Sequence, residues 1–255
     1  MPFQKVTPEK LASAVVSQIE ALILRGILRP GERLPSERDL AERFGVSRPS
    51  LREAVADLQE RGLLTTRAGS GIFVADVLGN AFSPALVDLF ARHEDAVSDY
   101  VSFRRDIEAL AAHRAARLAS DTDLQVINAI FEKMEAAHTT PDPEREARLD
   151  ADFHMAIMEA SHNVVMLHMM RSMFQLLQEG VFYNRQVMFR QASTRRALLD
   201  QHRAINDALR AHDPEAARTA VIRHLDFVEK GLSDQRRSDA NEAIARQRLD
   251  HERSR

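Results

Sequence analysis

The chain has 255 residues, of which 44% are hydrophobic and 29% charged, a composition that excludes extended disorder and allows two modest hydrophobic cores. Because it contains no cysteine, disulfide bonds, thiolate metal ligands and cysteine nucleophiles are excluded. The net charge of −3 excludes a strongly basic protein. No apolar run approaches the roughly 20 residues of a membrane span and no signal peptide is recognised, so we expect a cytoplasmic protein.

Three helices are predicted within the first 60 residues. Apolar side chains recur at helical spacing over residues 11–28, which predicts an amphipathic helix. A second, shorter helix begins after Ser36 and ends at Gly45, because glycine tolerates the positive φ that closes a helix. Ser47 caps a third helix, and Pro49 occupies its first turn. Two short helices joined by so tight a turn predict a helix-turn-helix.

The outward face of the third helix carries side chains that suit DNA. Helical spacing places there four donors that can reach phosphates or guanine edges in a major groove, namely Ser47, Arg48, Ser50 and Arg52. Residues 63–74 follow a strand, glycine-rich turn, strand pattern, which predicts a β-hairpin wing. Residues 1–75 hold 11 Lys or Arg against 9 Asp or Glu, a surplus of only two positive charges. Attraction to DNA must therefore come from where individual arginines lie rather than from the net charge of the segment. A winged helix-turn-helix domain is therefore predicted over residues 1–76.

Helical patterns fill the rest of the chain. A loss of periodicity predicts a linker at residues 77–83. The predicted helices lie near residues 84–92, 95–119, 122–138, 143–161, 164–191, 194–212 and 214–233. They indicate an antiparallel helical bundle over residues 84–233, so the fold class is mainly α with one small hairpin. Residues 234–255 are rich in charge and poor in large apolar side chains, which predicts a frayed or disordered tail.

One carboxylate and three imidazoles in the bundle have the spacing of metal ligands. Asp150 and His154 lie one turn apart on the same helical face. His202 and His224 each stand on an apolar stripe of a later helix, so we expect all four to face inward. Such a set suits a divalent metal ion such as Zn, Ni or Mn. The ordinary alternative is a group of hydrogen-bonded core histidines.

Three stretches near the start of the chain carry a family resemblance. They are Leu28-Arg-Pro-Gly-Glu-Arg-Leu-Pro-Ser-Glu-Arg-Asp-Leu-Ala41, Val46-Ser-Arg-Pro-Ser-Leu-Arg-Glu-Ala54 and Gly69-Ser-Gly-Ile-Phe-Val74. Together they resemble the DNA-binding domain of the GntR family of bacterial transcription regulators. The resemblance implies that four residues contact DNA, namely Arg38, Ser47, Arg48 and Arg52. It also implies that the wing tip at Gly69 enters the minor groove.

The bundle carries a second resemblance. The order Asp-x-x-x-His, then His, then a last His about 22 residues later is present as Asp150, His154, His202 and His224. This order resembles the metal-binding members of the FCD domain, the ligand-sensing domain of the FadR subfamily, and implies a bound divalent metal. The motif from Arg104 to Glu108 and the turn at Asn163 resemble the same domain. They imply that Arg104 and Asn163 contact the effector.

The bundle is also similar to the branch that contains the pyruvate dehydrogenase complex repressor and lactate-responsive regulators. This similarity implies a small 2-oxo or 2-hydroxy carboxylate, such as pyruvate or lactate, as the effector. The planar guanidinium of Arg104 could hold its carboxylate. The ordinary alternative makes Arg104 a helix-surface cation paired with Glu108.

These observations indicate a DNA-binding regulator rather than an enzyme. We expect a homodimer that binds a palindromic operator in double-stranded DNA, acts as a repressor and responds to the carboxylate. Two alternatives remain open at this point. One is a regulator with a purely structural metal and no effector. The other, less favoured, is a helical metalloenzyme, against which the sequence offers no general base beside the metal set.

Overall fold

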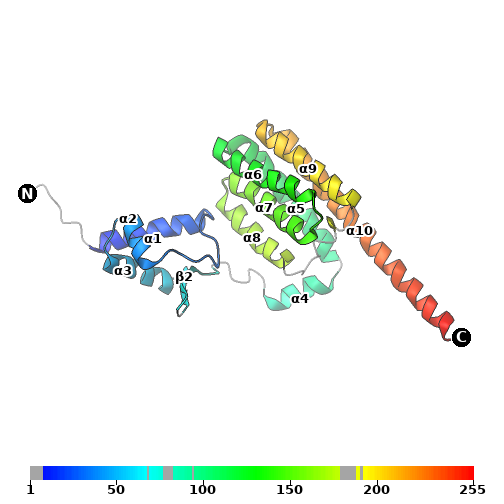
Figure 1. Ribbon diagram of the computed structural model, residues 1–255, viewed down its shortest axis with the longest axis horizontal. Helices are drawn as coiled ribbons and strands as arrows, with labels where there is room; N and C mark the ends of the chain where they lie inside the picture. Colours follow the sequence, from blue (N-terminus) through cyan, green and yellow to red (C-terminus); the bar gives the residue numbers. More distant parts are fainter. Residues whose placement is uncertain (1–7, 68, 77–82, 94, 179–187, 190–191) are drawn as a thin grey trace, which may run out of the picture. The chain divides into compact units, whose positions relative to one another are not determined.

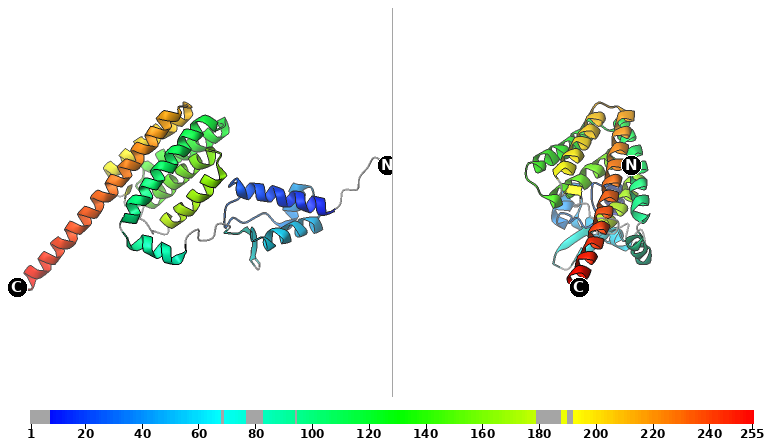
Figure 2. Two further views of the ribbon diagram at one scale, coloured as in Figure 1. Left: turned by 180° about the vertical axis from the view of Figure 1, so that it is seen from behind. Right: turned by 90° about the vertical axis from the view of Figure 1, so that its right-hand side faces the viewer.

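The computed structural model describes residues 8–67, 69–76, 83–93, 95–178, 188–189 and 192–255. The chain divides into two compact units, one ending at Ala81 and one beginning at Phe82. Figures 1 and 2 show helices in both units and a small hairpin in the first. The predicted fold class is therefore confirmed. None of the described helices combines the length and apolar character that crossing a membrane requires.

The first unit consists of three helices and a hairpin. Its elements are α1 (Pro8–Leu24), α2 (Glu37–Phe44), α3 (Arg48–Glu60), β1 (Leu64–Arg67) and β2 (Gly71–Val74). The strands are antiparallel, with Leu64 opposite Val74. Helix α1 packs against α3, and Ile19 and Leu58 are at most 1% exposed. Helix α1 ends at Leu24 rather than at residue 28, because Gly26 adopts a φ of 76°.

Local side-chain and backbone geometry sets the turn between α2 and α3. The Ser36 hydroxyl accepts a hydrogen bond from the backbone N–H of Asp39 at 3.3 Å and so caps α2. Gly45 ends α2 at a φ of 64°, a left-handed conformation that favours glycine. The Ser47 hydroxyl then accepts from the N–H of Ser50 at 3.3 Å and starts α3. The predicted helix-turn-helix is confirmed.

The second unit is a helical bundle. Its described helices are α4 (Pro84–Arg92), α5 (Asp95–Leu118), α6 (Asp121–His138), α7 (Pro143–Ala160), α8 (Val164–Gln178), α9 (Ala192–Arg210) and α10 (Pro214–Arg253). Helix α5 packs against α4, α7, α9 and α10. Its buried face carries Ala111, Ala112, Ala115 and Ala116, each at most 1% exposed. Small side chains there let the neighbouring helices approach closely.

Helix α10 differs from its predicted extent. It continues to Arg253, whereas the sequence pattern indicated a helix to residue 233 and then a frayed or disordered tail. Residues 237–255 are all exposed, and Figure 1 shows this red end projecting beyond the other helices of the unit. Side-chain pairs four residues apart, Gln235 with Asp239 and Glu242 with Arg246, support this helical segment.

Two other predicted segments lie partly outside the residues that the structure describes. The linker predicted at residues 77–83 lies outside the described residues except for Ser83, which caps α4. The helix predicted over 164–191 is present as α8 up to Gln178, and residues 179–187 and 190–191 lie outside the described part. Met188 and Phe189 form a short 3₁₀ turn, so an uninterrupted helix through these two residues was wrong.

Candidate metal centre and DNA-binding surface

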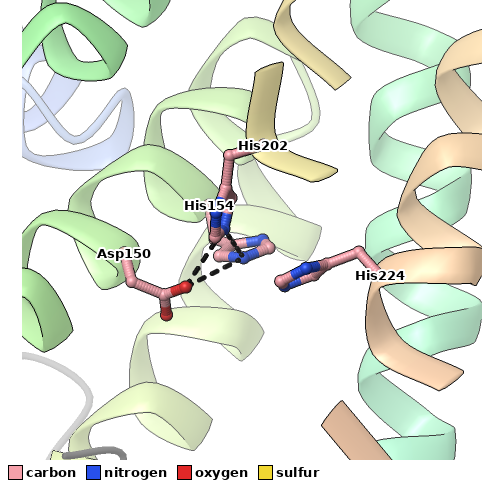
Figure 3. Close-up of side chains that lie close together, drawn as sticks. All are labelled: Asp150, His154, His202 and His224. Atoms are coloured by element: carbon pink, nitrogen blue, oxygen red, sulfur yellow. Dashed lines mark hydrogen bonds and ion pairs between the residues drawn. The ribbon is translucent and has the colours of Figure 1, made fainter. Parts of the chain in front are cut away.

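Four side chains from three helices meet in the interior of the second unit (Figure 3). Asp150 and His154 project from α7, His202 from α9 and His224 from α10. None of the four is more than 6% exposed. One possible ligand atom from each lies within 4.8 Å of those from the other three. The structure therefore brings together all four residues that the sequence placed on inward faces.

The donor atoms are spaced as ligands of a single ion would be. Oδ1 of Asp150 lies 3.1 Å from Nε2 of His202 and 3.7 Å from Nε2 of His154. The two Nε2 atoms are 3.4 Å apart. Ligands bound at about 2.0–2.1 Å in a tetrahedral zinc site lie about 3.3 Å from one another. The residues present therefore fit a divalent cation with little rearrangement.

Burial favours the neutral imidazoles that a metal requires. Burial lowers the pKa of His154, although the adjacent Glu108 carboxylate acts in the opposite direction. Burial also lowers the pKa of His224 well below its usual value, and the neighbouring rings of His202 and His154 add to the effect. Neither of these two rings has to lose a proton at neutral pH before it can bind a metal.

Two ligand rings have a partner at the nitrogen that faces away from the cluster. Nδ1 of His154 lies 2.6 Å from Oε2 of Glu108, and Nδ1 of His224 lies 3.0 Å from Oε1 of Gln201. Burial would raise the pKa of Glu108, but Arg104 and His154 lower it to about 2. Sequence reasoning assigned neither partner to a ring. Helical spacing could have indicated only the Arg104–Glu108 pair, and no local pattern links Gln201 to His224.

Arg104 is buried beside this cluster rather than on the helix surface. Its side chain is 2% exposed, and its Nε lies 2.6 Å from Oε1 of Glu108. The guanidinium also stacks 5.0 Å from the ring centre of Phe174. Arg104 lines a narrow cavity together with Asp150, Met188, Phe189, Leu198, His224 and Val228. The ion pair of the ordinary alternative is present, but its placement on the surface is wrong.

Asn163 occupies the turn before α8. Its Oδ1 accepts a hydrogen bond from the backbone N–H of Met166 at 3.1 Å, which caps the helix. Asn163 is not among the described residues that line the cavity beside Arg104. The structure thus supplies a structural reason for asparagine here, and its contact with an effector stays a prediction.

The predicted DNA contacts lie on exposed parts of the first unit. Arg38, Ser47, Arg48 and Arg52 are exposed, as is Gly69 at the turn of the hairpin. Arg38 lies 3.7 Å from Asp39, and Nε of Arg52 lies 2.8 Å from Oε2 of Glu37. Ser50 differs from expectation, because it is only 4% exposed and its hydroxyl bonds that of Ser47 at 2.9 Å. Three arginines and one serine of the predicted contacts are therefore exposed, and of these Arg38, Arg52 and Ser47 also have partners within the unit.

The wing carries a further basic side chain. Arg67, at the end of β1, lies over the ring of Phe73 on β2 with its guanidinium carbon 4.5 Å from the ring centre. Gly69 adopts a φ of 71° and Gly71 a φ of 103°, so the hairpin turn uses backbone conformations that favour glycine. The guanidinium of Arg67 therefore lies on the hairpin above Phe73, whose partner on β1 is Thr65.

Comparisons with known proteins agree on both units. The family described as "FCD domain" matches residues 99–227, and that described as "Bacterial regulatory proteins, gntR family" matches residues 11–74. The chain is 40% identical over 228 residues to the putative L-lactate dehydrogenase operon regulatory protein of Escherichia coli K12, covering 88% of this chain and 86% of that protein. It is 33% identical over 227 residues to the Glc operon transcriptional activator of the same strain, covering 88% and 89%. The solved structure of Streptococcus agalactiae GntR matches with a TM-score of 0.52 and 26% identity, covering 86% of this chain and 99% of that one.

Proposed function

Because the chain belongs to the GntR family of bacterial regulatory proteins and carries an FCD domain, we propose that a small carboxylate controls its binding to DNA. Both domains and the relatives identify a DNA-binding transcription regulator rather than an enzyme. The carboxylate would bind beside a metal ion in the second unit. The observation that carries this proposal is the buried cluster of one aspartate and three histidines with an arginine-lined cavity beside it.

The metal would be held by Asp150, His154, His202 and His224. One carboxylate and three neutral imidazoles suit Zn, Ni or Mn. When bound, such an ion supplies a Lewis-acidic position for an oxygen ligand. A site held by four protein ligands can also be purely structural, which makes the response to a carboxylate the decisive property.

Arg104 is the cation that would recognise the effector. Arg104 is buried and lines, with Asp150 and His224, a cavity about the size of one water molecule, so the effector would have to widen it. A planar guanidinium binds a carboxylate through two parallel hydrogen bonds, and burial strengthens them. A 2-oxo or 2-hydroxy carboxylate also carries an adjacent oxygen that can face the metal position. The name of the L-lactate operon relative makes L-lactate the first compound to test, and pyruvate, its 2-oxo counterpart, the second.

The first unit would read an operator as half of a dimer. A homodimer with twofold symmetry places two recognition helices on two half-sites, so the operator is expected to be a palindrome. Arg48 and Arg52 lie on the exposed face of α3, and Arg38 lies on α2. These side chains and the wing tip at Gly69 are the proposed contacts. Repression is expected where the operator overlaps a promoter.

Effector binding would act by changing the population of two dimer geometries. Only one geometry would match the spacing of the two half-sites. A carboxylate that binds the other geometry more tightly by about 1–3 kcal/mol lowers operator affinity about 5–150-fold. No contact between effector and DNA is required for this coupling.

The test is a fluorescence anisotropy titration of the purified protein on a duplex taken from upstream of its own gene. Pyruvate, L-lactate and glycolate are added with Zn²⁺ present and again after chelation. The proposal expects one of them to weaken DNA binding, and chelation to remove the response. Arg104→Met should also remove it, whereas Arg105→Met should respond normally, because Arg105 is 27% exposed and pairs with Asp226 and Glu229 rather than with Glu108. If none of the three compounds changes operator affinity at any concentration, the effector proposal is wrong.

A further inference from the structure

Glu108 stands between two groups that the proposed function uses separately. Its Oε1 lies 2.6 Å from Nε of Arg104, and its Oε2 lies 2.6 Å from Nδ1 of His154. The side chains of all three residues are at most 2% exposed. One oxygen of the buried Glu108 carboxylate contacts each partner. Glu108 therefore connects Arg104, the residue proposed to bind the effector, with His154, a proposed metal ligand.

The chemistry of a carboxylate decides which nitrogen of His154 carries a proton. An ionised carboxylate can only accept hydrogen bonds, and Oε2 of Glu108 meets no other donor in the described part of the chain, so a proton on Nδ1 of His154 is the one that would satisfy it. The neutral ring then has its lone pair on Nε2. That atom faces Nε2 of His202 at 3.4 Å and Oδ1 of Asp150 at 3.7 Å. Glu108 therefore selects the tautomer whose free nitrogen points into the cluster.

The other two rings are held differently. Nδ1 of His224 faces the neutral amide oxygen of Gln201 at 3.0 Å. Nδ1 of His202 has no hydrogen-bond partner in the described part of the chain. Among the three imidazoles, His154 is the one supported by a charged acceptor, which raises the basicity of a ligand more than a neutral amide does.

We propose that Glu108 is a positioning residue that orients His154 toward the metal and Arg104 toward the effector cavity. This inference rests on the proposed function, because it requires that the cluster binds a metal. The competing explanation is that Glu108 merely neutralises a buried arginine. Neutralisation alone would not fix the tautomer of His154, so the protonated nitrogen of that ring separates the two explanations.

The first measurement uses the unaltered protein without metal. Long-range ¹H–¹⁵N spectra of the histidine rings report which nitrogen carries the proton. The proposal expects His154 in the Nδ1–H form, and a His154 ring protonated at Nε2 instead would overturn it. This reading does not depend on whether any variant folds.

The second measurement is Zn²⁺ affinity by competition with a chromophoric chelator. Glu108→Gln is expected to lower the affinity about 10–100-fold, the usual effect of losing the partner of a ligand histidine. Glu229→Gln is the matched control, since Glu229 also pairs with an arginine of α5 but its side chain is 35% exposed. Gln201→Ala is a ring-specific comparison that should alter the spectrum of His224 and leave that of His154 unchanged.

The outcomes separate this inference from the function on which it rests. If the unaltered protein binds no Zn²⁺, Ni²⁺ or Mn²⁺, the proposed metal centre is wrong and Glu108 has nothing to position. If the unaltered protein binds metal and folded Glu108→Gln binds it equally well, the proposed function stands and the role of Glu108 is overturned. A loss confined to Glu108→Gln, with Glu229→Gln unchanged and His154 in the Nδ1–H form in the unaltered protein, supports the inference.

Discussion

Replacing Arg195 by methionine is expected to destabilise the second unit and to loosen its metal centre. Arg195 on α9 and Glu146 on α7 form a buried ion pair, with N–O distances of 2.6–3.0 Å and 7% exposure of each residue. The guanidinium also donates to the carbonyl of His138 at the end of α6 at 3.0 Å. Asp150 follows Glu146 by one helical turn, and His202 follows Arg195 by two, so the pair joins two helices that carry metal ligands.

The burial of the Arg195–Glu146 pair determines how much stability Arg195→Met should lose. Removing one partner of a buried pair costs about 3–5 kcal/mol, because the other charge stays desolvated and unpaired. Arg203→Met is the control on the same helix. Arg203 pairs with Glu135 and Asp200 but is 42% exposed, so its loss is expected to cost less than about 1 kcal/mol. Replacing both members of the buried pair, with Glu146→Leu added, should recover much of the loss.

Urea unfolding of the metal-free chain, followed by circular dichroism, measures the effect. A loss of about 4 kcal/mol divided by a urea m value of about 2–3 kcal/mol/M lowers the midpoint by roughly 1.3–2 M. Zn²⁺ affinity, measured on the folded variant, is expected to fall with it. A midpoint no lower than that of Arg203→Met would refute the reasoning, since the pair would then contribute no more than an exposed one.

Three further predictions concern single groups. Arg48→Ala should weaken operator binding by about 1–3 kcal/mol if the side chain contacts a base. Fluorescence anisotropy at several salt concentrations measures this, and a variant with the same operator affinity as the unaltered protein at every salt concentration would contradict it. The metal-free second unit should lose stability as the pH falls below 6.5, because unfolding lets His154 and His224 take up protons that burial denies them. Each histidine contributes up to about 1.4 kcal/mol per pH unit below that point and nothing above it, so thermal unfolding with a flat profile from pH 7 to 5 would refute this. Gly45→Ala should destabilise the first unit by about 1–2 kcal/mol despite open space around it, because a φ of 64° strains an L-residue, and an unchanged unfolding midpoint would contradict this.

Sequence patterns within single helices were sufficient for much of the architecture. Ser36, Gly45 and Ser47 marked the ends of two short helices because capping depends on residues adjacent in the chain. The inward face shared by Asp150 and His154 followed from the helical period alone. These features are local, so they need no knowledge of neighbouring helices.

Contacts between helices could not be predicted in this way. Ser50 stands at an outward position by spacing, yet it is buried, and Arg104 is buried where a surface cation was the alternative. The partnership of Gln201 with His224 joins α9 to α10, and that of Glu108 with His154 joins α5 to α7. Each depends on how far one helix is rotated and shifted against another.

The sequence by itself therefore determined the fold class, the helix-turn-helix and the four candidate metal ligands of this protein. Only the tertiary structure decided that the carboxylate of Glu108 faces His154 and that Arg104, the arginine of the proposed effector site, lies buried beside the metal ligands. It also decided that the ion pair of Arg195 and Glu146 joins α9 to α7, two helices that carry metal ligands. The physical reason is that periodicity specifies which face of a helix is buried. Packing of side chains between helices then selects the partner that each buried polar group meets.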